Sequence, residues 1–505
     1  MKACLLLQRR FAYVGHKLAK ILKEKYGIEE FCGYVYLRSS FEFLKNQKDI
    51  NYTSLLLDED IHNCYRQELL DLEYLKNLEK EYGLPNLWPY IAPDRVVMFN
   101  MLAREYPYNK PKYNHEEMMR ILQVKAKAII KFLDEERPDF LFASVIGGIG
   151  SILLFHIAKS KGIKIILCAE TRINDDLTLS EGYKNFSWAE ELFDNLTKNN
   201  TESKKIREAN DYLKKFREYS ITYFYAFPNK NRGSRQNQLK WFLPNNFFRS
   251  LIWFVKSTFN YFFKKKFLDY CEESPWGFFI DRLKRKTRLL IGFQRLYEPT
   301  RPTEDYAFFP LHYEPEISLL MFAPFWTDQI NLIRQIAKSL PLHFKLYVKE
   351  HPAMLGYRPY NYYRELKKIP NVKLIDPTVS PFDIIRNAKL VTAITSTIGW
   401  EAILLKKPVI TFGDVSYNKL SSVKHCHDIE RLPFLVKEQL EKFNYNESEL
   451  INFIGAILEE SSPINLAEIW GKGVTSEIEK EKLTLLADLI AKKLNLKLPV
   501  MINGK

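Results

Sequence analysis

Alternating strand and helix patterns predict an α/β chain built on parallel sheets. Short β-rich apolar runs occur at residues 344–348, 390–394 and 408–412, and helical patterns lie between them at 360–368 and 398–405. Strands that alternate with helices form right-handed units on a parallel sheet. Ligands of such sheets bind beyond the carboxyl ends of the strands. Polar residues that directly follow a predicted strand are therefore the candidates for a functional site.

The N-terminal half repeats the same alternation, as a Rossmann-like half would. Strands are predicted at residues 3–7, 140–145 and 163–168. Asn114, with Glu117 three residues later, has the signature of a capping box and predicts a helix over 114–135. Residues 51–82, rich in Leu, Glu, Asp and Tyr, are expected to be helical. The glycine turn at 147–150 has two interpretations, close packing or a ligand loop. The turn lacks the Walker lysine that would identify a nucleotide-binding loop.

Composition indicates a globular protein of a reducing compartment. The 505 residues are 46% hydrophobic, which is enough for two domain cores. Six cysteines are scattered without a CxxC pair, which favours free thiols and a cytoplasmic location. The apolar run near Met1 is too short for a signal peptide. No stretch of about 20 apolar residues predicts a transmembrane helix.

The net charge of +14 is concentrated in one aromatic segment. Residues 230–295 contain 15 Lys or Arg and 4 Asp or Glu, interleaved with Phe, Trp and Tyr. Three interpretations compete: an element on the inner membrane surface, a nucleic-acid surface, or an interdomain insertion whose aromatics form core. Because no nucleic-acid motif accompanies the charge, nucleic acid is not an expected partner.

The segment from 346 to 413 combines the features of a phosphate site. A histidine and a lysine follow one predicted strand, and hydroxyls, a glycine and an acid open the helix after another. A helix N-terminus attracts anions. The candidate donor and phosphate residues are Lys349, His351, Ser396, Thr397, Gly399 and Glu401. The structural alternatives are a salt-bridged strand lysine, a packed histidine, and a helix-start glutamate without a ligand.

Further polar residues follow other predicted strands. His312 follows the strand at 308–311 and is a candidate for the donor site. Gln329, in the first turn of the helix at 326–340, could face the donor, and Arg172, after the strand at 163–168, could pair with a sugar carboxylate or a phosphate. The candidates for a catalytic base or nucleophile are Glu170, Glu314 and Glu316. The alternatives are a Glu–Arg pair at a loop rim and solvated acids in a surface turn.

Two motifs carry a family resemblance. KEHP at 349–352, with TSTIGWEAILLKKPVITFG from 395, resembles the donor half of the bacterial capsule polysaccharide biosynthesis family. That family includes the capsular Kdo transferases, which have a GT-B fold, and the resemblance covers residues 306–417. It implies a nucleotide-sugar donor of the CMP-Kdo kind. It also implies that the loop at Ser380 and Pro381 contacts the nucleobase.

The resemblance implies a domain arrangement. A GT-B chain has two Rossmann-like domains that face a cleft. We expect an acceptor domain at 1–215, a basic insertion or linker at 216–300, a donor domain at 301–475, and a last helix at 476–505 that crosses back.

These features together predict a glycosyltransferase of surface polysaccharide assembly with a lipid-linked saccharide acceptor. Transfer is expected to need no metal or other cofactor, because no DxD pair stands where a divalent ion would bind. Two other functions remain open. One is a phosphotransferase that uses a CDP-polyol, as in teichoic-acid polymerases, and the other is a non-catalytic export or scaffold protein.

Overall fold

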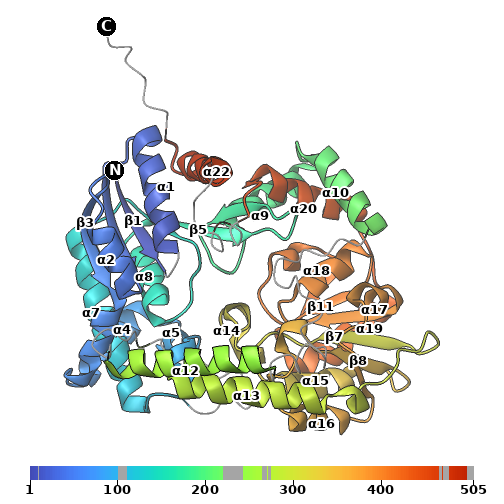
Figure 1. Cartoon of the computed structure of the whole chain (residues 1–505). Coiled ribbons are helices and arrows are strands. Elements are labelled where there is room, and N and C mark those ends of the chain that lie inside the picture. The colour runs from blue at the N-terminus through green and yellow to red at the C-terminus, as the bar shows by residue number, and fades with distance from the viewer. Residues whose placement is uncertain are drawn as a thin grey trace. The chain divides into compact units, whose positions relative to one another are not determined.

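The computed structural model describes residues 1–8, 11–99, 111–219, 243–263, 270, 274–465, 469 and 477–496. The chain divides into two compact units (Figure 1). Unit 1 is formed by residues 1–98, 113–209 and 452–505, and unit 2 by 99–112 and 210–451. Each unit has its own sheet, so the predicted α/β chain with two Rossmann-like units is confirmed.

The unit 1 sheet has a parallel centre and antiparallel edge strands. Its order is β13-β6-β5-β4-β1-β2-β3, in which β1 to β5 are parallel and β6 and β13 are antiparallel. The strands are β1 (Lys2–Leu7), β2 (Glu30–Val35), β3 (Asn51–Leu57), β4 (Phe140–Ala143), β5 (Lys164–Glu170), β6 (Leu177–Ser180) and β13 (Ser461–Ser462).

Helices surround this sheet, and the last helix within the described residues packs on α1. The helices are α1 (Phe11–Tyr26), α2 (Arg38–Lys45), α3 (Asp58–Asn63), α4 (Leu72–Tyr82), α5 (Trp88–Ile91), α6 (Arg95–Phe99), α7 (His115–Glu136), α8 (Ile149–Ser160), α9 (Ser187–Asn199) and α22 (Glu477–Lys493). α22 lies against α1 (Figure 1). In α7 the expected capping box is present, because the Asn114 side chain accepts from the Glu117 N–H and the Glu117 side chain accepts from the Asn114 N–H.

The prediction of helix over residues 51–82 is wrong for its first part. Residues 51–57 form β3, which pairs in parallel with β2, and helix begins only at Asp58. Of the seven residues of β3 only Tyr52 and Thr53 are of the types that favour strands, so the pairing with β2 decides the strand. The prediction extended the helix too far because the charged residues after Leu57 carry a helical pattern.

The unit 2 sheet is fully parallel. Its order is β12-β11-β10-β7-β8-β9, so the chain fills one side of β7 and then returns to fill the other. The strands are β7 (Tyr306–Pro310), β8 (Lys345–Lys349), β9 (Val372–Ile375), β10 (Leu390–Ala393), β11 (Val409–Thr411) and β12 (Val423–His425). This reversal makes a topological switch point between β7 and β10, which is the place where such sheets bind ligands.

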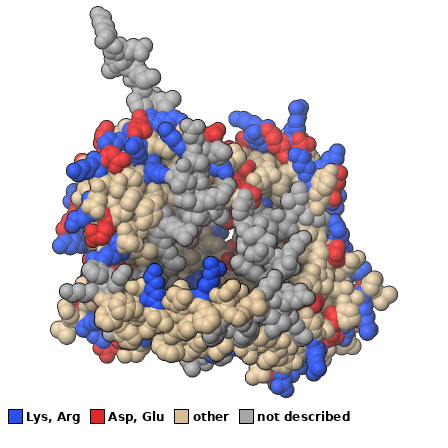
Figure 2. Space-filling view, in the orientation of Figure 1, with Lys and Arg blue, Asp and Glu red and all other residues tan. Residues whose placement is uncertain are grey.

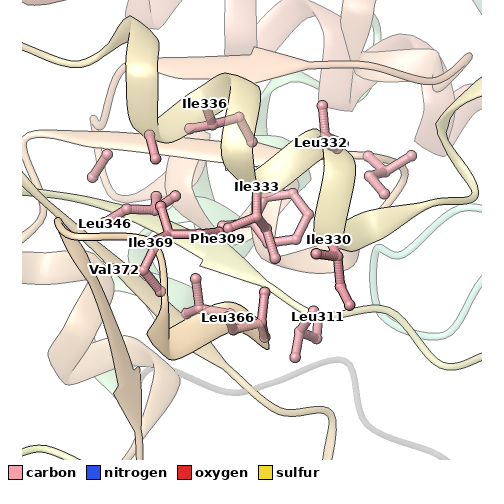
Figure 3. Close-up of a cluster of buried hydrophobic side chains, with 14 of the residues drawn as sticks. Phe309, Leu311, Ile330, Leu332, Ile333, Ile336, Leu346, Leu366, Ile369 and Val372 are labelled. Atoms are coloured by element: carbon pink, nitrogen blue, oxygen red, sulfur yellow. The ribbon is translucent and has the colours of Figure 1, made fainter. Parts of the chain in front are cut away.

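Helices from both sides cover the unit 2 sheet. They include α14 (Ile317–Phe322), α15 (Gln329–Ser339), α16 (Tyr360–Lys367), α17 (Pro381–Asn387), α18 (Thr397–Leu404) and α19 (Leu432–Glu441). Ile333 and Ile336 of α15 lie in one core cluster with Phe309, Leu346 and Val372 from three neighbouring strands (Figure 3). Burial of each such side chain contributes roughly 1.5–3 kcal/mol. This core fixes the strand ends that carry the candidate site.

Part of the basic aromatic segment forms two paired helices, α12 (Pro244–Phe263) and α13 (Pro275–Ile291). The Phe254 ring lies 4.7 Å from Trp276 and 5.3 Å from Phe279, centroid to centroid. The rest of the segment, at 230–242, 264–269 and 271–273, lies outside the described residues. Among the helices that are described, none has the length and apolar character needed to cross a membrane.

Two further helices lie where the chain passes from one unit to the other. These are α10 (Ile206–Tyr219) and α20 (Glu447–Glu459). Arg217, near the end of α10, donates to the Leu404 carbonyl at 2.9 Å and to Glu447 at 2.6 Å. Within unit 2, these contacts hold α10 beside the end of α18.

Candidate functional site

The carboxyl edge of the unit 2 sheet brings together the residues predicted from separate motifs. His312 follows β7, His351 follows β8, and Ser396 follows β10. Because β8, β7 and β10 are neighbours in the sheet, their ends lie side by side. The edge therefore gathers imidazoles, a hydroxyl and the start of α18.

His312 joins the loops on the two sides of the switch point. Its Nε2 accepts a hydrogen bond from the Thr395 N–H at 3.3 Å, and the residue is only 6% exposed. A neutral imidazole that accepts at Nε2 carries its proton on Nδ1. His312 thus couples the β7 loop to the β10 loop directly beside the start of α18.

Arg358 forms the centre of a buried ionic cluster behind this edge. Its guanidinium pairs with Glu350 and, at 3.1 Å, with Glu314, and it donates to the His312 carbonyl at 2.6 Å. Tyr363 donates to the other Glu350 oxygen at 2.6 Å. Arg358 is fully buried, and burial of its charge is offset by these two carboxylates. The cluster holds the loops after β7 and β8 in place.

The predicted residues Glu314 and Gln329 belong to this support. Gln329 accepts from the His312 N–H at 2.8 Å and donates to Glu314, and both residues are at least 98% buried. Glu314 was a candidate for the base, but its carboxylate is held by Arg358 and Gln329. We carry only Glu316 and Glu170 forward as candidates for that role. Glu316 is the partly exposed N-cap residue of α14.

His351 presents a neutral imidazole at the end of β8. Its Nδ1 accepts from the Ala353 N–H at 3.2 Å, which leaves the proton on Nε2. Burial lowers the pKa of His351 to about 4, and Arg358 and Lys349 act in the same direction against Glu350. The ring of Tyr313 lies edge-on at 6.1 Å. A partly buried N–H donor of this kind suits a phosphate oxygen.

Lys349 ends β8 with its side chain almost fully buried, at 6% exposure. Burial lowers the pKa of Lys349 to about 8, while the charges of Glu350, Asp376 and Glu401 oppose this shift. The lysine is therefore a buried group that changes protonation near neutral pH. Lysines with lowered pKa values in such surroundings are found at functional sites more often than elsewhere.

Glu401 lies inside the site rather than at its mouth. It is 2% exposed on α18, and its charge acts on Lys349. The sequence predicted it as a donor-site residue on the helix after β10. The structure gives it a second role, which is to balance the lysine.

The start of α18 is built by a serine cap. The Ser396 side chain accepts from the Ile398 N–H at 3.1 Å, and the Ser396 carbonyl accepts from the Tyr417 hydroxyl at 2.8 Å. Thr397, the first helical residue, is partly exposed. A Cβ at Gly399 would lie 2.5 Å from the Tyr417 oxygen. Gly399 was expected to let a ligand approach the backbone. In this structure the side chain that approaches the backbone there is Tyr417.

The predicted nucleobase loop follows β9 at the same edge. Ser380 is the N-cap residue of α17 and Pro381 is its first helical residue, and both are partly exposed. Asp376 shapes the loop, because its side chain accepts from the Thr378 N–H at 2.8 Å and from the Thr378 hydroxyl at 2.6 Å.

The two remaining predicted residues lie in unit 1. Glu170 is the exposed last residue of β5, and Arg172 follows it with a positive φ of 64°. Thr171 holds this turn through a bond from its hydroxyl to the Asp176 carbonyl at 2.8 Å. Burial and the charge of Asp175 raise the pKa of Asp176 to about 6.

The glycine turn of unit 1 is closed by packing. Asp94 accepts from the Ile149 N–H at 2.9 Å, at the start of α8, and its other oxygen accepts from the Val96 N–H at 3.0 Å. A Cβ at Gly150 would lie 2.1 Å from the Tyr34 oxygen. Of the two interpretations of this turn, close packing is the one that these contacts support. Sequence reasoning missed Asp94, because it lies far from the turn along the chain.

Comparison with known proteins adds the family. Residues 304–426 match the model described as "Capsule polysaccharide biosynthesis protein". This segment runs from just before β7 to Cys426 after β12, so it contains every unit 2 residue of the candidate site.

Curated relatives match parts of the chain. Protein FixF of Sinorhizobium fredii is 30% identical over 146 residues, which are 28% of this chain and 34% of FixF. The capsule polysaccharide modification protein LipA of Neisseria meningitidis serogroup B is 34% identical over 68 residues, which are 14% of this chain and 10% of LipA. The chain therefore spans about a third of FixF and a tenth of LipA.

Among solved structures, two matches come from one protein. They are described as Thermosulfurimonas dismutans KpsC, beta Kdo 2,4 transferase and beta Kdo 2,7 transferase. The first is 14% identical, with 69% of this chain and 88% of that chain covered and a TM-score of 0.38. The second is 14% identical, with coverage of 71% and 89% and a TM-score of 0.33.

Proposed function

We propose that the chain is a glycosyltransferase of capsular or other surface polysaccharide assembly, with its nucleotide-sugar site in unit 2. The observation that carries the proposal is the convergence of His351, Ser396 and the start of α18 at the switch point of a parallel sheet. The match of residues 304–426 to the capsule family supports the same function.

The chemistry proposed for this edge is stabilisation of a departing phosphate. As the bond between the anomeric carbon and the phosphate oxygen breaks, negative charge grows on that oxygen. The Nε2–H of His351 would donate to it, and the positive end of the α18 dipole would stabilise the charge. Lys349, with a pKa of about 8, would supply positive charge or a proton.

An acceptor hydroxyl forms the new bond and must lose its proton. Glu316 in unit 2 and Glu170 in unit 1 are the carboxylates that we propose for this role. Arg172 is proposed to pair with an acidic group of the sugar or acceptor. Ser380 and Pro381 are proposed for the nucleobase.

We propose a CMP-activated, Kdo-like donor, metal-independent transfer and a lipid-linked acceptor on the cytoplasmic side of the membrane. The KpsC structures are described as Kdo transferases and LipA as a capsule polysaccharide modification protein, which motivates the proposed sugar and polymer.

A thermal-shift series with CMP, CDP, UDP and GDP tests the proposal. A nucleotide at about 100 times its Kd stabilises a protein by roughly 2.7 kcal/mol. Stabilisation that is largest with CMP, and lost in His351→Ala, would support the transferase. A larger response to CDP-glycerol would favour the phosphotransferase, and no response to any nucleotide would favour a non-catalytic protein.

A further inference from the structure

An exposed apolar stripe runs along α12. Phe248, Ile252, Val255, Phe259 and Phe262 are each 60–65% exposed. They recur at intervals of four, three, four and three residues, which places them on one face of the helix. An exposed row of large apolar side chains marks an interaction surface.

The stripe points away from the partner helix. Phe254 of α12 packs on Trp276 and Phe279 of α13, and it lies roughly 120–140° around the helix from Phe248 and Phe259. On the other side of the pair, Arg288 of α13 donates to the Tyr357 carbonyl at 2.5 Å and so ties α13 to the body of unit 2. The hairpin is therefore anchored through α13 and presents α12 outward.

Cations flank the stripe on one side. Arg249 and Lys256 are exposed and follow the stripe residues Phe248 and Val255 by one position. α12 contains no acidic residue. Exposed Arg282 and Lys284 add to the charge on α13. In Figure 2 the band where α12 and α13 run is mostly tan, with blue side chains projecting from it.

We propose that the outer face of α12 docks in the interface of an anionic lipid bilayer. A helix with an apolar aromatic face and flanking cations lies in the plane of the headgroups, where aromatic rings are favoured. Anionic headgroups complement Arg249 and Lys256. A second copy of the same face would instead bring these like charges together, so lipid is the better occupant. This proposal does not depend on the proposed transferase activity.

Flotation of the full chain with vesicles tests the proposal. We expect binding to phosphatidylcholine vesicles that contain phosphatidylglycerol, and much weaker binding to phosphatidylcholine alone. Phe259→Glu should lower the vesicle affinity by roughly tenfold or more. Phe434→Glu is the matched control, because Phe434 is 70% exposed on α19, and it should bind as the unchanged protein does.

The charge contribution is tested separately. Arg249→Gln and Lys256→Gln should each lower the affinity for anionic vesicles by about fivefold, and the loss should shrink in high salt. Both variants and Phe259→Glu should keep the thermal midpoint and the nucleotide response, because the changed side chains are exposed.

Three results would overturn the proposal. The first is full vesicle binding by Phe259→Glu. The second is no vesicle binding by the unchanged chain, together with self-association in sedimentation that Phe259→Glu abolishes, which would make the face a dimer contact. The third is tight binding of single-stranded RNA that competes with vesicles, which would assign the face to nucleic acid.

Discussion

At the scale of single residues, the two histidines at the sheet edge hold their protons on different nitrogens. His312 accepts at Nε2 from the Thr395 N–H, whereas His351 accepts at Nδ1 from the Ala353 N–H. The first histidine is therefore used to join two loops, and the second keeps an Nε2–H that can donate to a ligand. This difference could not be predicted from the sequence, where both residues simply follow a strand.

His351→Ala is expected to weaken CMP binding by roughly 10- to 100-fold, because a hydrogen bond to a charged group contributes about 1.5–3 kcal/mol. Isothermal titration calorimetry gives the affinity. His343→Ala is the matched control, since the His343 side chain is 68% exposed, and it should leave the affinity unchanged. Equal affinities of the two variants would remove His351 from the site.

The lowered pKa of Lys349 predicts that the protein takes up a proton when it binds a nucleotide near pH 8. Its pKa is about 8 in the free protein, so about half of the molecules are charged at that pH. A bound phosphate favours the charged form and raises the pKa, so protons must enter. Titration calorimetry in two buffers of different ionisation enthalpy measures the uptake. Lys349→Met should abolish it, and proton release by the unchanged protein would contradict the assignment.

Arg358→Met is expected to destabilise the protein by about 3–5 kcal/mol, because Glu314 and Glu350 would be left as buried charges. Urea unfolding measures the change. Adding Glu314→Gln and Glu350→Gln should recover much of the loss. Arg334→Met serves as the control, since Arg334 is 44% exposed in a loose ion pair, and should change stability by less than about 0.5 kcal/mol. A similarly small effect of Arg358→Met would show that the cluster is not stabilising.

At the scale of elements, α18 depends on the fit between Gly399 and Tyr417. Ser396 caps the helix, and the Tyr417 hydroxyl bonds to the Ser396 carbonyl across Gly399. The position of the helix start is thus set by a contact from the loop after β11. That loop is not adjacent in sequence.

Gly399→Ala should cost about 1–3 kcal/mol, because the new Cβ would overlap the Tyr417 oxygen. The double variant Gly399→Ala with Tyr417→Phe should be more stable than Gly399→Ala alone, because the nearest remaining atom, the ring Cζ, is 3.1 Å away. Thermal and urea unfolding compare them. If the double variant were the less stable of the two, steric overlap would not be the cause.

Much of the element order was predictable from the sequence, and the exceptions share one cause. The strands at 344–348, 390–394 and 408–412 were found within one or two residues, because each is a short apolar run. The capping box of α7 was found because it is local. β3 was missed because its pairing with β2, and not its composition, decides the strand.

The candidate site shows the same division. His312, His351 and Ser396 could be placed at one edge, because the ends of parallel strands converge. The roles of Glu314, Gln329 and Arg358 could not be predicted from the sequence. They depend on a buried ion pair between segments that lie 44 residues apart. A sequence pattern records that a residue is charged, and only the packing shows whether the charge faces a ligand or a partner.

At the scale of the whole molecule, the two units share a sheet plan and differ at the helix that follows the switch point. In unit 1 the start of α8 donates to Asp94. In unit 2 the start of α18 is capped by Ser396, lies beside His312 and falls within the matched residues 304–426. The acidic side chain of Asp94 disfavours an anion at the start of α8. This asymmetry is the reason for placing the nucleotide in unit 2.

The most direct test is a crystal structure of the full chain with CMP. The account predicts density for the phosphate within hydrogen-bonding distance of His351 Nε2 and of the first amides of α18. Clear density for the nucleotide elsewhere, such as beside the glycine turn of unit 1, with the edge between β7 and β10 unchanged, would contradict it.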